Sequence, residues 1–198
     1  MLDTRDILER LPAREGHFLL ESGYHTNVWL TLDALFVRPQ QIAPLVTALA
    51  ARLRTHDVSA VCGPLLGGAF LAQAIATTLD IEFFVTEPVS ANAAGLFSAR
   101  YRLPAGLERR IAGQRVAIVD DVISAGSSVR ATVDAVSAGG GVIAVVGTLM
   151  ALGRVGLDHF EGFAIPVEAL GRRDFALWPP SACPLCQKGM PLQDPSEC

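Results

Sequence analysis

The sequence predicts an α/β protein whose core is a mostly parallel, doubly wound sheet. Short apolar runs rich in β-branched residues occur at 58–62, 116–119 and 142–149, as expected for strands buried on both faces. Between them, apolar residues recur at helical spacing after Pro39 and through residues 129–136. The 198 residues, 51% of them hydrophobic, suit one domain with a sizeable core.

Composition narrows the range of partners. The net charge is −4 and there is no basic stripe, which argues against a nucleic-acid partner. The longest apolar run, residues 142–152, is shorter than the roughly 20 residues that cross a bilayer, so no membrane partner is expected. The charged start, residues 1–6, does not resemble a signal peptide. With four cysteines and no secretory signal, we expect a reducing, cytoplasmic setting.

The stretch from 116 to 129 combines a buried strand, two acids and the start of a helix. Ser127 or Ser128 is suited to cap this helix. A helix N-terminus and serine hydroxyls bind phosphate, whereas paired carboxylates accept hydrogen bonds from vicinal hydroxyls or hold a divalent cation. The stretch therefore suits a sugar phosphate, and the alternative is an ordinary βα turn with solvated acids. Its candidate residues are Asp120, Asp121, Val122, Ile123, Ser124, Ala125, Gly126, Ser127 and Ser128.

Four apolar residues, Asp-Asp, two apolar residues and then Ser-Ala-Gly-Ser-Ser resemble the phosphoribosyl pyrophosphate (PRPP) signature of the type I phosphoribosyltransferases. The resemblance implies the fold of that family, with a small hood and a flexible arm, and commonly a homodimer. It also implies displacement of pyrophosphate from C1 of PRPP by a base nitrogen, with Mg²⁺ held mainly by PRPP. Asp120 and Asp121 would hold the ribose hydroxyls, the backbone of residues 124–128 the 5-phosphate, and Ser124 would also lie near the base.

A second glycine-containing loop lies between a predicted strand and a predicted helix. It lacks the Rossmann spacing and the Walker Lys-Ser/Thr, so neither dinucleotide nor ATP binding is indicated. Alone, its glycines would suggest only tight packing. Beside the PRPP signature, the loop resembles the family's pyrophosphate loop, with candidate residues Gly63, Pro64, Leu65, Leu66, Gly67 and Gly68. The preceding Cys62 is predicted to be a buried core thiol.

The position of the family's catalytic arm is occupied by a segment of unusual composition. Residues 90–95 are small, and residues 97–103 alternate as a strand with one apolar and one basic face. Residues 86–89 read Thr-Glu-Pro-Val where orotate phosphoribosyltransferases carry an Arg-Lys pair, and the arm contains no lysine. Arg100 and Arg102 would supply the missing positive charge, or they lie on a solvated strand face.

Two features concern the acceptor base. Ser22-Gly23, followed by polar residues and an aromatic-containing strand at 28–32, is similar to the start of orotate phosphoribosyltransferases, which lies beside the pyrimidine. The alternative is a hairpin packed on the sheet edge. Arg154, just beyond the last core strand, matches the family arginine that contacts the orotate carboxylate. Orotate is therefore the expected acceptor, with a purine or other salvage base, or an RNA-binding PRPP sensor on the same fold, as alternatives.

The organisation expected is a single domain with a hood segment (1–37), a core (38–171) and a Pro-rich tail (172–198) that could join the hood. A helix is expected at 4–11 and an edge strand at 163–170, where Pro166 is tolerable. In the tail, Cys183-x-x-Cys186 is half of a structural zinc site, to be completed by Cys198 or a second subunit. The alternative is a pair of reduced thiols.

Overall fold

The structure is a computed structural model that describes residues 12–89 and 95–193. The expected helix at 4–11, most of the small-residue segment of the arm, and Cys198 lie outside these residues. No helix in the two described ranges is long and apolar enough to cross a membrane.

The central sheet contains six strands within the described residues, in the order β5-β4-β3-β6-β7-β8. Its strands are β3 (Ala60–Pro64), β4 (Glu82–Val89), β5 (Arg100–Arg102), β6 (Arg115–Ile123), β7 (Val142–Leu152) and β8 (Val167–Arg173). Every neighbouring pair is parallel except β4 and β5, which are antiparallel. The mostly parallel sheet is therefore confirmed. The strand order reverses between β3 and β6, where doubly wound sheets bind ligands at the carboxyl ends of the strands.

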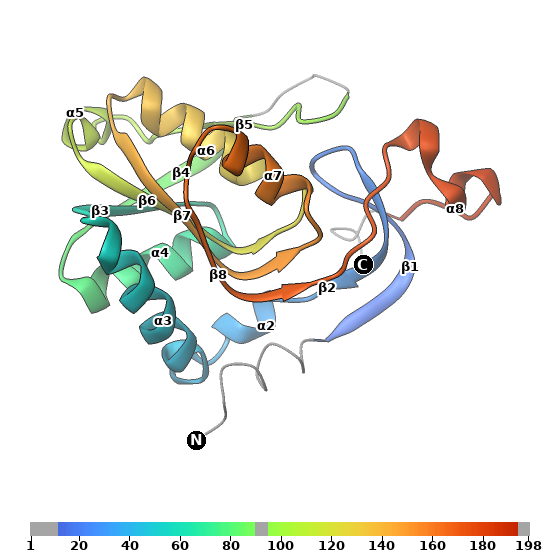
Figure 1. Ribbon diagram of the computed structural model, residues 1–198, viewed down its shortest axis with the longest axis horizontal. Helices are drawn as coiled ribbons and strands as arrows, with labels where there is room; N and C mark the ends of the chain where they lie inside the picture. Colours follow the sequence, from blue (N-terminus) through green and yellow to red (C-terminus); the bar gives the residue numbers. More distant parts are fainter. Residues whose placement is uncertain (1–11, 90–94, 194–198) are drawn as a thin grey trace.

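Helices cover both faces of the sheet (Figure 1). One face carries α3 (Pro39–Leu53) and α4 (Gly67–Leu79), and the other carries α5 (Glu108–Ile111), α6 (Ser127–Ala138) and α7 (Val155–Gly162). Successive side chains of β6 supply both layers: Ala117 and Val119 pack with α3 and α4, and Val116 and Ile118 pack with α5 and α6. This is why the strand reads as a continuous apolar run instead of an alternating one.

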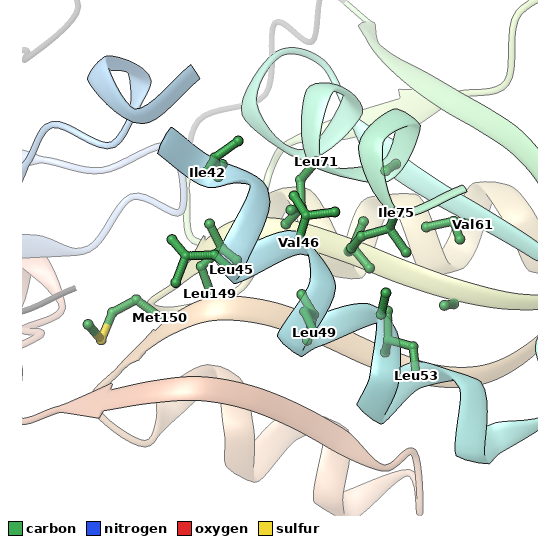
Figure 2. Close-up of a cluster of buried hydrophobic side chains, with 14 of the residues drawn as sticks. Ile42, Leu45, Val46, Leu49, Leu53, Val61, Leu71, Ile75, Leu149 and Met150 are labelled. Atoms are coloured by element: carbon green, nitrogen blue, oxygen red, sulfur yellow. The ribbon is translucent and has the colours of Figure 1, made fainter. Parts of the chain in front are cut away.

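The predicted helix after Pro39 is confirmed as α3, with Pro39 in its first turn. Leu45, Leu49 and Leu53 are fully buried and point towards α4 and the sheet, as Figure 2 shows. Burial of each leucine contributes about 1.5–3 kcal/mol, so this face holds the helix in place.

Local expectations differ from the structure at three points. The cap of α6 is Gly126 in the left-handed region (φ 79°) and not Ser127 or Ser128, which form the first turn of the helix. The arm strand is only Arg100–Arg102, because Phe97 has a φ of 56° and cannot continue a strand. The edge strand β8 begins after Pro166, because Ala164 has a φ of 55°.

The hood is a separate antiparallel hairpin of β1 (Ala13–Leu19) and β2 (His25–Leu30), followed by α2 (Asp33–Phe36), and not a hairpin on the main sheet edge. The tail, with the short helix α8 (Pro184–Gln187), returns to this hairpin (Figure 1). His25 and Trp178 exchange two backbone hydrogen bonds of 2.8 and 3.0 Å, and Gln193 bonds the backbone of His17 and Leu19. The tail therefore packs on the hairpin through backbone hydrogen bonds.

Candidate active site

The two predicted loops meet at the carboxyl ends of β3 and β6. A Cβ on Gly67 would lie 2.6 Å from Asp121 Oδ2, and a Cβ on Gly68 would lie 2.8 Å from Asp120 Oδ1. Glycine leaves both carboxylates in place, because a side chain at either position would displace a carboxylate or the loop. The glycine loop, in which the Leu65–Leu66 peptide bond is cis, therefore lies directly against the acidic pair.

Asp120 is the more buried of the two acids, with 7% of its surface exposed. Its carboxylate accepts hydrogen bonds from Ser128 Oγ (2.7 Å) and from the Asp121 amide (3.0 Å). Burial, and then the neighbouring Asp121 carboxylate, raise the pKa of Asp120 well above its usual range. A bound cation, or positive charge that develops on a substrate, would favour the ionised form of Asp120.

Asp121 is oriented by its own strand and by the next one. Its Oδ1 accepts a hydrogen bond of 2.8 Å from the Val122 amide, and its backbone carbonyl accepts one of 3.2 Å from the buried Thr148 hydroxyl on β7. The strand therefore fixes the direction of this side chain.

The start of α6 provides a seat for an anion. Gly126 turns the chain so that the first amides of this twelve-residue helix are free of helical partners. The Ser127 hydroxyl is buried and has no hydrogen-bond partner in the part of the chain that the structure describes. A buried hydroxyl without a partner costs free energy, so it points to a ligand such as phosphate.

A cavity of about 540 Å³ joins these features, a size typical of small-molecule sites. Most of the predicted residues line it: Pro64, Leu65, Leu66, Gly67, Asp120, Asp121, Val122, Ser124, Gly126, Ser127 and Ser128. The remaining residues of the two loops, Gly63, Gly68, Ile123 and Ala125, are buried behind this wall and shape it.

The opposite wall comes from the hood and the arm, and it includes residues that the sequence did not single out. Tyr101 of β5 donates a hydrogen bond of 2.9 Å to Glu21 Oε1, and both residues line the cavity with Trp29. Burial raises the pKa of Glu21, and burial and the Glu21 carboxylate raise the pKa of Tyr101. The alternating pattern of the arm strand could have indicated Tyr101, because Tyr101 lies on the strand face opposite Arg100 and Arg102.

The arginines expected at the site lie outside the cavity lining. Arg102 is paired with Glu87 (2.8 Å), and the Arg100 guanidinium donates to backbone carbonyls of residues 97–99. Arg154 is paired with Asp158 (2.7 Å) and Glu161 (2.9 Å), beside a neighbouring hollow that shares Phe175 with the main cavity. The functional roles assigned to these three arginines therefore stay predictions.

The cysteines occupy two environments. Cys62 is fully buried in β3, and burial raises the pKa of its thiol to about 12, which agrees with a core thiol. Cys183 and Cys186 lie beside the hood strands and not in the cavity wall.

The protein-family model described as the phosphoribosyl transferase domain matches residues 37–153 of this sequence, which include both loops and the arm. The chain belongs to the phosphoribosyltransferase family. This chain is 31% identical over 195 residues to a protein from Thermotoga maritima that is named orotate phosphoribosyltransferase. The match covers 96% of each chain.

Solved structures of phosphoribosyltransferases share the fold. An adenine phosphoribosyltransferase from Thermoanaerobacter pseudethanolicus aligns with a TM-score of 0.69 at 17% identity, covering 86% of this chain and 100% of that one. An orotate phosphoribosyltransferase from Mycobacterium tuberculosis aligns with a TM-score of 0.65 at 23% identity, covering 85% and 94%. Enzymes named for different bases thus share this backbone, and the fold alone leaves the acceptor open.

Proposed function

We propose that this phosphoribosyltransferase transfers the phosphoribosyl group of PRPP to orotate and forms orotidine 5′-phosphate. The PRPP part is supported by the convergence of Asp120, Asp121 and the Ser127 hydroxyl on one cavity, since that buried hydroxyl has no hydrogen-bond partner among the described residues. The orotate part is supported by the Thermotoga maritima relative, whose similarity extends through the hood as well as the core.

In the proposed mechanism the acidic pair holds the ribose. The two carboxylates accept hydrogen bonds from its vicinal hydroxyls, which replace water around the buried Asp120 and the half-buried Asp121. As the bond from C1 to pyrophosphate lengthens, positive charge develops on the ribose ring. Asp120 and Asp121 stabilise that charge from fixed positions, so they favour the transition state over the ground state.

The remaining groups of PRPP match the two loops. The first amides of α6 and the Ser127 hydroxyl would bind the 5-phosphate, and the loop at residues 63–68 would face the pyrophosphate. Mg²⁺ fits this arrangement, because the adjacent carboxylates of Asp120 and Asp121 are hard oxygen ligands that can reach the ion directly or through water. When bound, it would neutralise charge on the leaving pyrophosphate.

The base would lie between Ser124 and the hood, where Ser22 and Trp29 line the cavity. Arg154 is the candidate partner for the orotate carboxylate. Its ion pairs with Asp158 and Glu161 are exposed to solvent and therefore weak, so a substrate carboxylate could compete for its guanidinium. The arm without lysine favours the second candidate, a salvage base that lacks a carboxylate.

Two further features belong to the proposal. A homodimer would let the arm of one copy reach the site of the other, which would give Arg100 and Arg102 a role that they do not have in the single chain. A cytoplasmic location agrees with Cys62, Cys183 and Cys186, the cysteines of the described residues, forming no disulfide.

The test is a panel of bases. Pyrophosphate release from PRPP and Mg²⁺ would be measured with orotate, uracil and adenine, in the wild type and in Arg154→Ala. We expect orotate to be the preferred base. The variant should lose on the order of 100-fold in kcat/KM for orotate and bind PRPP normally, because the substrate carboxylate would lose its charged partner.

The matched control is Arg110→Ala, which removes another exposed arginine paired with a glutamate, Glu82. Equal losses in both variants would make Arg154 a structural residue. Turnover of adenine or uracil with none of orotate would assign the protein to base salvage, and no PRPP consumption with any base would contradict the proposed activity altogether.

A further inference from the structure

We propose that His17, His25, Cys183 and Cys186 form a structural zinc site that fastens the tail to the hood. One ligand atom from each residue lies within 4.8 Å of all the others. This inference goes beyond the transferase activity and does not depend on which base the enzyme uses.

The spacing of the four atoms fits tetrahedral zinc. With Zn–N distances of about 2.0–2.1 Å and Zn–S distances of about 2.3 Å, a tetrahedron has N–N edges of about 3.3 Å and N–S edges of about 3.6 Å. His17 Nε2 lies 3.1 Å from His25 Nδ1, 3.4 Å from Cys183 Sγ and 3.7 Å from Cys186 Sγ. Cys186 Sγ lies 3.3 Å from His25 Nδ1. All four measured edges agree with a tetrahedron to within about 0.3 Å.

Hydrogen bonding alone does not account for this cluster. His17 Nε2 has three potential partners within 3.7 Å, yet an imidazole nitrogen either donates or accepts a single hydrogen bond. The other ring nitrogen, Nδ1, lies 2.9 Å from the Met190 carbonyl oxygen, which can only accept. The proton therefore belongs on Nδ1, and Nε2 presents a lone pair to the centre of the cluster. A backbone carbonyl that orients a histidine in this way is typical of metal sites.

The elements around the cluster suit a permanent metal site. Cys183 and Cys186 have the Cys-x-x-Cys spacing of zinc knuckles, with Cys183 immediately before α8. His17 and His25 come from the two paired strands of the hood. Both histidines and Cys183 are at most 5% exposed, and Cys186 is exposed at the edge of the cluster. Because the chain supplies four ligand atoms, no coordination position is left open, as in structural zinc sites. The sequence predicted the cysteine half, and we assign the second half to His17 and His25, the histidines that the described part of the chain brings to the two cysteines.

The position of the cluster gives it a role in the active site. His17 and His25 stand at the two ends of the hairpin turn, and the tip of that turn contributes Glu21 and Ser22 to the cavity wall. The Ser22 carbonyl also accepts a hydrogen bond of 2.9 Å from the Phe97 amide in the arm. Zinc would therefore hold the base of the loop that forms the hood side of the cavity, and it would link residues 166 positions apart in the sequence.

The first experiment measures metal in the untagged full chain. We expect about one zinc ion per chain by plasma mass spectrometry after gel filtration, since the chain supplies one four-ligand site. Cys183→Ser with Cys186→Ser should abolish zinc retention, whereas Cys62→Ser, which changes a buried cysteine elsewhere, should retain it. Cobalt-loaded wild type should show the thiolate charge-transfer band and the strong visible bands of tetrahedral S₂N₂ coordination.

A second measurement keeps the wild-type residues, so that its result does not depend on the folding of a variant. Chelator would be added to the folded protein while a zinc indicator and a thiol reagent follow release. Two thiols should become reactive for each zinc released, and the melting temperature should fall. Three results would each overturn the proposal. The first is a protein that contains no zinc after growth in zinc-rich medium and gives no tetrahedral cobalt spectrum. The others are full zinc retention in the double variant and an intact mass that shows a Cys183–Cys186 disulfide. The transferase assay is independent of these readouts, so the two proposals can fail separately.

Discussion

Gly67→Ala tests whether the position of Asp121 controls catalysis. The new methyl group would lie 2.6 Å from Asp121 Oδ2 and 2.8 Å from its Cγ. Ordinary contact begins at 3.4 Å, so the carboxylate must move by about 0.8 Å, the difference between 3.4 and 2.6 Å. A displacement of about 1 Å from the productive geometry can reduce the rate by about 100-fold, so we expect kcat/KM to fall by about 10- to 100-fold.

Stability should change little in this variant. The contacted atoms belong to the end of one aspartate side chain, which can shift at the cost of weakening its hydrogen bond from the Val122 amide. Gly67 is also the first residue of α4, where alanine is acceptable. We expect the free energy of unfolding to stay within about 1 kcal/mol of wild type. The variant should therefore separate catalysis from folding.

Two alanine substitutions serve as matched controls. At Gly68 the new Cβ would lie 2.6 Å from the Pro64 ring and 2.8 Å from the Val119 carbonyl oxygen, so Gly68→Ala should destabilise the fold itself. At Gly162 the new Cβ would meet no atom of another described segment within 4 Å, so Gly162→Ala should change neither property. The measurements are steady-state kinetics with PRPP and the preferred base, and urea unfolding. A Gly67→Ala enzyme with wild-type kcat/KM would refute the placement of Asp121 at the reacting ribose.

Two further predictions concern buried polar groups. Because the pKa of Asp120 is raised on folding, the contribution of Asp120 to stability is full below its unfolded pKa of about 3.9 and is lost as pH rises towards the folded pKa. Asp120→Asn should therefore become more stable relative to wild type as pH rises above about 4, and its turnover should fall. The measurement is urea unfolding of the ligand-free protein at a series of pH values. A stability difference between the two proteins that does not vary with pH would contradict this prediction. Thr86 and Thr132 join β4 to α6 through a buried hydroxyl pair 2.7 Å apart, so either single change to valine should cost about 1–3 kcal/mol by leaving one hydroxyl unpaired. The double variant should recover part of that loss, and strictly additive losses would show that the pair is not coupled.

The sequence alone was sufficient for the parts of the protein that depend on local patterns. The apolar run at 116–119, the acids that follow it and the small residues up to Ser128 indicated a strand, a loop and a helix N-terminus. The structure contains these elements as β6 and α6, because burial on both faces of a parallel strand leaves a continuous apolar signature. Local patterning failed at the helix cap, where Gly126 and not a serine occupies the left-handed position.

Contacts between distant segments were decided only by the tertiary structure. The sequence shows Glu21 and Tyr101 as two unrelated polar residues, but folding brings them together across the cavity. His17 and His25 carry no metal-binding spacing of their own, and they become candidate ligands only because the tail returns to the hood and places Cys183 beside them. Arg154 shows the opposite case, since its position in the sequence suggested the base and folding pairs it with Asp158. Sequence spacing specifies which element a residue belongs to, whereas its partners depend on how the sheet, hood and tail pack, and that packing is set by long-range burial.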